Sequence, residues 1–384
     1  MFMKNVLMKT LLFILIIIIN LIQINCKFKT VCYLRVDESQ RIDVQTINGT
    51  LCTHIILAFA VLNNGIIVPK EVDDIFYYQN VTTLKTKYND LKVMLSIGGG
   101  GSDGSGFHEI CSNQTNIDRF VWSVLDFLLK YNLDGLDLDW EFPAWNTPFP
   151  NDKYKFTQLL KTLHLWFGRQ QNRIDRRHDL LLSCAVSAIV NVVDGAYDMP
   201  DMAQYIDFVN VMSYDFHIYS KYWPFTGYNS PLFNRKVEKS YFSLLNTNRS
   251  INYWVDLGMS KDKIMVGIPT YGHTYVLANT DHTTPDSAAI QQLDDISYPS
   301  VCQMMRNSSS KVIFDVESKV PYLVNDNHWI SYDDEISVAF KAQWIRDNGF
   351  AGAMTYDLNN DDFNYICNNE TKFPLHSIIY SIIN

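Results

Sequence analysis

The segment from residue 133 to residue 143, LDGLDLDWEFP, decides the fold predicted for this chain. Between residues 136 and 142, apolar and acidic residues alternate with a period of two, which is typical of a β-strand. The carboxylates of Asp137, Asp139 and Glu141 therefore project from one side of the strand. Helices can cover the apolar side, so the acidic side is expected to face a polar cavity or site.

These three carboxylates repel one another, because residues on the same face of a strand are only about 7 Å apart. At least one of them should therefore hold a proton more tightly than a free side chain does. Acid catalysis requires such a group. Two other interpretations of the pattern are the solvated face of an edge strand and a magnesium or calcium site.

Other short apolar runs, separated by helical patterns, predict the rest of the fold. Strands alternating with helices imply parallel β/α units, and eight strands indicate a closed (β/α)8 TIM barrel of the α/β class. Active sites of such barrels lie at the carboxyl ends of the strands, where Glu141 is placed. The predicted strands are 30–34, 54–60, 92–97, 135–142, 181–187, 208–214, 264–270 and 351–355, and the predicted helices are 117–131, 153–167, 239–257 and 335–348.

The stretch between the seventh and eighth strands is too long for a single crossover. It contains the strand-like runs 311–314 and 329–331, so we expect a small α+β insertion at 273–333. The barrel is then formed by residues 27–272 and 334–384.

Residues 1–26 have the features of a secretory signal peptide. Lys4 and Lys9 precede an apolar run, 11–19, that is too short to cross a bilayer. The alternative is an uncleaved membrane anchor. Cleavage predicts a secreted protein with no membrane attachment, and the formal charge of −9 without a basic run argues against nucleic-acid partners.

Secretion makes disulfides and glycans expected features of the mature chain. If Cys26 leaves with the signal, six cysteines remain, and their spacing does not assign the pairs. Acceptors of the Asn-x-Ser/Thr type occur at Asn48, Asn80, Asn113, Asn248, Asn307 and Asn369.

The string DGLDLDWE at residues 134–141 resembles the signature of glycoside hydrolase family 18, the chitinases and their relatives. The resemblance extends over most of the mature chain and includes the expected insertion. The other similar segments are VCY (31–33), CTHIILAFA (52–60), KVMLSIGG (92–99), VMSYDFH (211–217), GIPTYG (267–272), VPY (320–322) and WISYDD (329–334).

The resemblance implies a retaining glycosidase without metal or cofactor, in which the 2-acetamido oxygen of the substrate attacks the anomeric carbon. Glu141 would protonate the leaving oxygen and later activate water. Asp139 would hydrogen-bond the acetamido N–H and stabilise the intermediate, with Asp137 below it sharing charge and proton. Tyr214 would donate to the acetamido carbonyl, and Asp215 would hydrogen-bond the sugar.

The implied substrate is chitin or its β-1,4-linked N-acetylglucosamine oligosaccharides, and the protein is expected to be a monomer. By resemblance, Cys32 pairs with Cys52 and Cys302 with Cys367, while Cys111 and Cys184 are expected to be buried thiols. The residues implied to contact the sugar are Tyr33, Phe59, Gly99, Gly100, Phe142, Met212, Tyr271 and Tyr356.

Several positions depart from the family pattern. Tyr356 replaces the tryptophan that usually forms the floor under the reacting sugar. Asp37 and Gly100 stand where aromatic residues usually line the outer cleft, and His273 stands in place of the usual arginine. Without these stacking aromatic residues, a long polymer should bind more weakly, although Trp145 and other loop aromatics could compensate.

Two alternatives to a chitin hydrolase follow from these departures. One is a lectin-like protein of the same fold that binds chitin oligosaccharides without cutting them. In that class the acid is typically replaced, whereas Glu141 is present here. The other is an enzyme directed at N-glycan cores or chitobiose, because an altered cleft could suit a short or branched substrate.

Overall fold

The computed structural model describes residues 28–37, 39, 41–170, 179–368 and 370–384. The predicted signal peptide and the acceptor Asn369 lie outside this range, as does Lys27 at the predicted start of the barrel. Among the described helices, none has both the length and the hydropathy needed to span a bilayer.

Within the described residues, eight parallel strands pair side by side, and the ring closes where the first strand meets both the second and the last. This confirms the predicted (β/α)8 barrel. A further strand, β3 (Ile66–Pro69), pairs antiparallel with β2 outside the ring. The barrel strands, in ring order, are β1 (Lys29–Arg35), β2 (His54–Asn63), β4 (Lys92–Gly98), β5 (Gly135–Asp139), β6 (Leu181–Ser187), β7 (Phe208–Met212), β8 (Ile264–Pro269) and β15 (Gly352–Tyr356).

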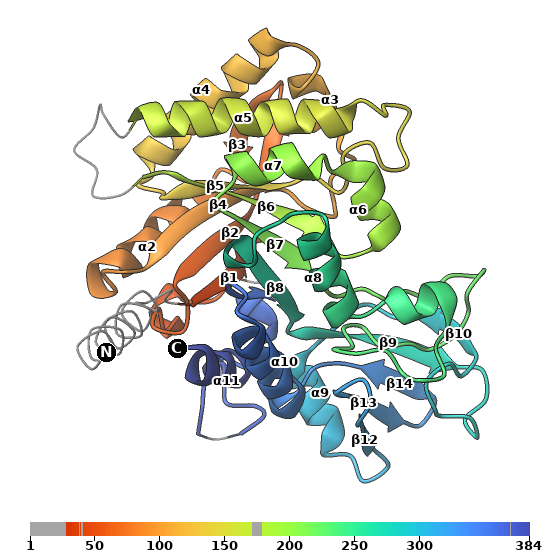
Figure 1. The fold of residues 1–384 in the computed structure, drawn as a ribbon. Helices are drawn as coiled ribbons and strands as arrows, with labels where there is room; N and C mark the ends of the chain where they lie inside the picture. The colour runs from red at the N-terminus through yellow and green to blue at the C-terminus, as the bar shows by residue number, and fades with distance from the viewer. Residues whose placement is uncertain (1–27, 38, 40, 171–178, 369) are drawn as a thin grey trace, which may run out of the picture.

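The alternation of side chains along each strand produces two cores. In β1, Val31 and Tyr33 point into the barrel, whereas Cys32 and Leu34 pack against the surrounding layer. Helices cover the outside of the ring (Figure 1). They are α2 (Asp74–Lys87), α3 (Ser105–Ile110), α4 (Gln114–Lys130), α5 (Asp152–Gln170), α6 (Val190–Ala196), α7 (Met199–Tyr205), α8 (Thr247–Asp256), α10 (Glu335–Asn348) and α11 (Pro374–Ile383), with short 3-10 turns η2 (Val44–Thr46), η3 (Ser240–Leu244), η4 (Lys261–Lys263) and η5 (Leu358–Asn360).

Two predicted elements are wrong in their extent. The expected helix 239–257 is the turn η3 followed by α8, because the side chain of Asn246 accepts a hydrogen bond from the Arg249 N–H and starts a new helix. The strand expected at 135–142 ends at Asp139, where its pairing with β4 ends. Trp140 nevertheless packs toward the helices, stacked on a phenylalanine of α3 with ring centroids 5.2 Å apart.

The long stretch after β8 folds as a second, antiparallel sheet with one helix, which confirms the predicted insertion between the seventh and eighth barrel strands. Its first strand begins at Tyr271, slightly before the boundary predicted at His273. Its elements are β9 (Tyr271–Leu277), β10 (Ala289–Gln292), β11 (Ile296–Ser297), α9 (Tyr298–Met305), β12 (Lys311–Asp315), β13 (Val320–Asn325) and β14 (His328–Ser331).

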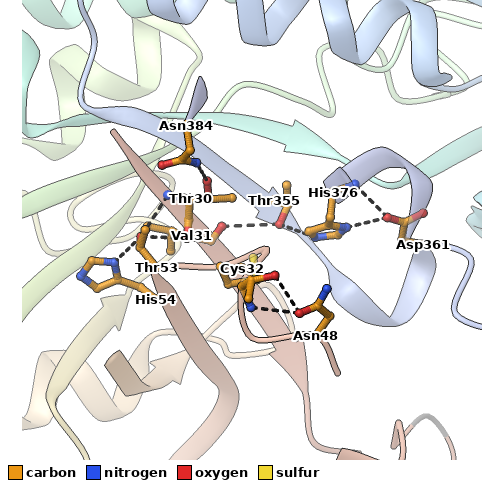
Figure 2. Close-up of a disulfide and its surroundings, with 12 residues drawn as sticks. Thr30, Val31, Cys32, Asn48, Thr53, His54, Thr355, Asp361, His376 and Asn384 are labelled. Carbon is orange, nitrogen blue, oxygen red and sulfur yellow. Dashed lines mark hydrogen bonds and ion pairs between the residues drawn. A yellow bond between two sulfur atoms is a disulfide. The ribbon is translucent and has the colours of Figure 1, made fainter. Parts of the chain in front are cut away.

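Both implied disulfides are present. Cys32–Cys52 ties β1 to the segment that precedes β2, beside a buried chain in which His376 links Asp361 to Thr355 (Figure 2). The second bridge joins α9 of the insertion to the segment before α11: Cys302–Cys367. Cys111 and Cys184 are free and buried, as predicted.

A buried ion pair provides a test of the packing between α10 and the insertion. The Lys341 ammonium is fully buried and lies 2.7 Å from both oxygens of Asp333. Lys341→Met should lower the free energy of unfolding by about 3–5 kcal/mol, because it leaves a buried carboxylate without its counter-charge. Lys70→Met, which breaks an exposed pair with Asp37, should cost less than about 1 kcal/mol. Urea unfolding measures both values, and equal losses would contradict this assignment.

Candidate active site

A pocket of about 280 Å³ opens at the carboxyl ends of the barrel strands. Two larger cavities, of about 700 and 910 Å³, adjoin it and share lining residues with it. Its walls come from the ends of β1, β2, β5, β6, β7 and β15 and from the insertion. The lining residues are Tyr33, Arg35, Phe59, Gly100, Asp139, Glu141, Ala185, Met212, Tyr214, Asp215, Tyr271, Asp295, Tyr356 and Asn360.

Asp137 lies beneath this pocket and is completely buried in the barrel. Its Oδ2 accepts hydrogen bonds from the hydroxyls of Tyr33 and Ser96, each at 2.7 Å. Its Oδ1 accepts bonds from Ser183 Oγ at 2.6 Å and Asn210 Nδ2 at 3.1 Å. Burial raises the pKa of Asp137 above its usual range, although all four hydrogen bonds lower it.

Asp139 and Glu141 form a hydrogen-bonded pair of carboxyl groups above Asp137. Burial and the charges of Glu141 and Asp137 hold the pKa of Asp139 well above its usual range. Burial and the charge of Asp215 raise the pKa of Glu141 to about 7. The two groups titrate together, so the pair carries a proton near neutral pH.

Two polar atoms in this pocket are open to a ligand. Oδ1 of Asp139 is buried and has no hydrogen-bond partner among the described residues. The Tyr214 hydroxyl contacts only the thioether sulfur of Met354, at 4.0 Å, within the part of the chain described. A thioether is a weak acceptor, so the hydroxyl can donate to a bound molecule. Burial holds the pKa of Tyr214 well above 10, which keeps that proton in place.

Asp215 lies at the pocket rim, with its backbone in the left-handed region (φ 55°) and its N–H bonded to Asn229 Oδ1 at 2.8 Å. Its Oδ1 accepts bonds from the Tyr271 hydroxyl at 2.6 Å and from His273 Nε2 at 3.0 Å. His273 Nδ1 reaches Asp295 Oδ1 at 2.9 Å. The histidine that replaces the usual arginine thus bridges two carboxylates.

Most residues predicted for the site meet in this pocket. Tyr33, Phe59, Gly100, Met212, Tyr271 and Tyr356 line it together with Asp139, Glu141, Tyr214 and Asp215. Gly99 lies behind Phe59, where a β-carbon would approach the ring to 2.7 Å, and Phe142 packs half-buried against the outer core. Asp134 points elsewhere, accepting bonds from the Val93 N–H and Lys85.

Sequence reasoning missed Ser183 and Asn210, two of the four donors to Asp137. It also missed Arg35, which lines the pocket and pairs with Asp357 at 2.6 Å. The available signal was a polar residue inside an otherwise apolar predicted strand, as in LLSCAVS (181–187) and FVNVM (208–212). Asp295 was missed because it reaches the site from the insertion.

The fold and the pocket define a (β/α)8-barrel protein whose site is built from carboxylates. The chain belongs to glycosyl hydrolases family 18, whose model matches residues 29–361. It is 31% identical over 373 residues to Chitinase-3-like protein 2 of Homo sapiens, covering 94% of each chain.

Two solved structures are similar over nearly the whole chain. One is the immunomodulatory active chitinase TsES1 from Trichuris suis, with a TM-score of 0.87, 34% identity, and coverage of 93% of this chain and 100% of that one. The other is human YKL-39, described as a pseudo-chitinase with retained chitooligosaccharide binding, with a TM-score of 0.85, 31% identity, and coverage of 92% and 98%.

The bridged histidine makes folding stability depend on pH. Burial lowers the pKa of His273, but hydrogen bonds to Asp215 and Asp295 and their charges outweigh it and raise the pKa to about 9. A histidine whose pKa is raised in the folded state stabilises the fold fully below its pKa in the unfolded chain, about 6.5. This stabilisation is lost as the pH rises through 9. The stability difference between the natural protein and His273→Gln should therefore shrink by about 3 kcal/mol at most between pH 6.5 and 9.

Urea unfolding at several pH values measures this difference. His217→Gln is the matched control, because burial lowers the pKa of His217 to about 4, so this side chain stays neutral across the same interval. A difference for His273→Gln that is constant from pH 6.5 to 9 would show that this histidine is not held in its charged form.

Proposed function

We propose that this protein is a secreted glycoside hydrolase that cleaves β-1,4-linked N-acetylglucosamine chains through the substrate's own acetamido group. One observation carries the proposal: Asp139, Glu141 and Tyr214 line one small pocket and present an unpaired carboxyl oxygen, a carboxyl with a pKa of about 7, and a hydroxyl bonded only to a thioether sulfur among the described residues. An acetamido group offers one N–H and one carbonyl, which match the first and third of these.

In the first step, Glu141 gives its proton to the glycosidic oxygen as the bond to the anomeric carbon breaks. The acetamido carbonyl oxygen attacks that carbon from the opposite face, with Tyr214 donating to the carbonyl. Asp139, having passed the shared proton to Glu141, accepts the acetamido N–H and offsets the positive charge of the oxazolinium ring. Tyr356 lies beneath the sugar as a stacking surface.

In the second step, the Glu141 carboxylate removes a proton from water, which attacks the anomeric carbon and reopens the ring. Two displacements at one carbon retain its configuration. None of the residues in these roles requires a metal ion or a cofactor.

The relatives support the substrate class without deciding between cleavage and binding, since one is a chitinase and another a pseudo-chitinase that binds chitooligosaccharides. The second candidate is therefore a lectin-like binder of the same oligosaccharides. The presence of Glu141 with a raised pKa favours the enzyme. The lost aromatic positions at Asp37 and Gly100 favour soluble oligosaccharides over polymer as the substrate.

Secretion is part of the proposal. Two disulfides link residues 20 and 65 positions apart in the chain, and such bridges persist in oxidising compartments. The N-terminal sequence and the Asn-x-Ser/Thr acceptors support the same route. The protein is proposed to act as a monomer.

Glu141→Gln tests the assignment of the acid. Turnover of a fluorogenic chitotrioside should fall by about 10²–10⁴-fold, because glutamine offers no transferable proton, while binding of chitotetraose measured by calorimetry is retained. Glu370→Gln, the same change at an exposed position, should leave turnover unaffected. Binding of chitotetraose by a natural protein that releases no fluorophore would identify the lectin-like alternative.

The pH profile tests how Glu141 is tuned. Because the acid must be protonated, kcat/KM should fall above about pH 7. Asp215→Asn removes a negative charge that raises the pKa of Glu141, so the alkaline limb should move to lower pH. Initial rates from pH 4 to 9 measure both limbs. An unmoved or upward-shifted limb in Asp215→Asn would refute the coupling between these two carboxylates.

A further inference from the structure

The pocket that holds Asp139 and Glu141 shares walls with two larger cavities in different parts of the fold. The first, of about 700 Å³, lies between the β2–β3 hairpin and α3 and shares Phe59 with the pocket. The second, of about 910 Å³, lies between the barrel and the insertion and shares Arg35 and Asn360 with it. We name them the hairpin cavity and the insertion cavity. A glycan with one sugar in the pocket extends into at least one of them.

Carboxylates predominate among the charged side chains that line these three spaces. The basic side chains there, within the described residues, are Arg35, Lys70 and His328. Arg35 lies 2.6 Å from Asp357, and Lys70 lies 2.6 Å from Asp37, so both of these charges are balanced. The lining carboxylates are Asp37, Asp103 and Glu109 in the hairpin cavity, Asp294 and Asp295 in the insertion cavity, and Asp139, Glu141 and Asp215 in the pocket.

Each outer cavity has one carboxylate without a partner. The side chains of Glu109, on α3, and Asp294, just before β11, form no hydrogen bond or ion pair within the described part of the chain. Both residues are exposed to solvent. A ligand can therefore reach these two carboxylates without displacing a protein cation.

The outer cavities offer few aromatic faces on which a neutral sugar could stack. Phe59 and Phe107 line the hairpin cavity, but Phe107 is fully buried and its ring is stacked on Trp140. Phe363 is the phenyl ring that lines the insertion cavity. Ligand pockets are usually lined mainly by hydrophobic and aromatic side chains. Charge is therefore the more selective property of these two cavities.

The pocket between them has a different requirement. Oδ1 of Asp139 is buried there and has no hydrogen-bond partner among the described residues, which points to a ligand group that completes it. Together with the Tyr214 hydroxyl it matches an acetamido group, whose oxygen must attack the anomeric carbon. A sugar with a free amine offers no such oxygen. The acetyl group is therefore required on the sugar in this pocket, whereas the outer cavities impose no such requirement.

A positively charged substituent would complement the outer cavities. Removal of the acetyl group from N-acetylglucosamine leaves glucosamine, whose amine at C2 is protonated in mildly acidic solution. A cleft lined by charges of one sign raises the local concentration of a ligand of opposite charge. Salt weakens this attraction, because exposed charges are screened over about 10 Å at 0.1 M ionic strength.

We propose that the substrate of this site is partially deacetylated chitin, with N-acetylglucosamine in the pocket and cationic glucosamine in the hairpin and insertion cavities. The inference rests on the proposed function and narrows its substrate class. Glu109 and Asp294 are the specificity-determining residues, because they contact the outer sugars and take no part in bond cleavage.

Calorimetric binding to the Glu141→Gln protein at about pH 5.5 tests the inference without hydrolysis. One ligand is a chitosan hexasaccharide fraction with about half of its amines acetylated. The other is the same fraction after complete N-acetylation, so the chain length is unchanged and the positive charge is removed. The half-acetylated form should bind about 5–20-fold more tightly in low salt, because each exposed ion pair contributes about 2–5-fold. The difference should shrink in 0.5 M salt.

Glu109→Gln and Asp294→Asn, made in the Glu141→Gln protein, each remove one charge without breaking an ion pair. Each should weaken binding of the half-acetylated hexasaccharide by about 2–5-fold and leave binding of the fully acetylated one unchanged. The matched control is Glu370→Gln, at an exposed position that lines none of the three spaces. It should alter neither affinity.

Equal or weaker binding of the half-acetylated hexasaccharide would overturn the inference. Equal losses for both ligands in Glu109→Gln and Asp294→Asn would overturn it as well and leave these residues with a packing role.

Hydrolysis by the natural protein is scored separately. If neither hexasaccharide is cleaved, the proposed function fails, whereas a charge-dependent preference in binding still supports the cationic ligand. Cleavage of both with the same kcat/KM would support the proposed function and overturn the inference.

Discussion

A carboxylate buried at the centre of the barrel is the feature on which the rest of the site depends. Asp137 is surrounded by donors from four strands, and its position fixes the side chains directly above it. Like charges in a poorly solvated interior cannot both ionise easily, so the groups above it, Asp139 and Glu141, retain a proton. The raised pKa of Glu141 follows from its burial just beyond this strand and from the charge of Asp215.

The barrel architecture makes this arrangement possible. Parallel strands place their carboxyl ends at one face, and a period of two sends alternate acids inward. The insertion supplies Asp295 and, through β9, the bridging His273. The surroundings of the Asp215 carboxylate at the pocket rim therefore depend partly on residues outside the barrel. Packing, the Cys302–Cys367 disulfide and the buried Lys341–Asp333 pair hold these two parts together.

The sequence predicted the barrel well because strand periodicity is a local signal. The acids of β5 and the apolar runs around them are each visible within a few residues. Helix α2 was not predicted, since its buried residues include Asp74, Thr82 and two tyrosines instead of an aliphatic stripe. The break at Asn246 was missed because a capping side chain is hard to distinguish from an ordinary polar residue within a helical pattern.

The site residues predicted from the sequence are those within the motif segments. Ser183 and Asn210 reach Asp137 because of strand register and contacts across the barrel. Their spacing in the sequence does not predict these contacts. His273 could be recognised as a departure, but its two carboxylate partners lie 58 and 22 residues away in the chain. Such contacts can be identified only from the three-dimensional arrangement of the barrel and the insertion.

The most direct test of the central claim is the configuration of the first product released from chitotetraose. Proton NMR during the first minutes of hydrolysis resolves the new reducing end before mutarotation. Attack by the substrate's own acetamido group, with Glu141 serving twice, predicts that the β-anomer appears first. Initial release of the α-anomer would contradict the account, because it would require a single displacement by water.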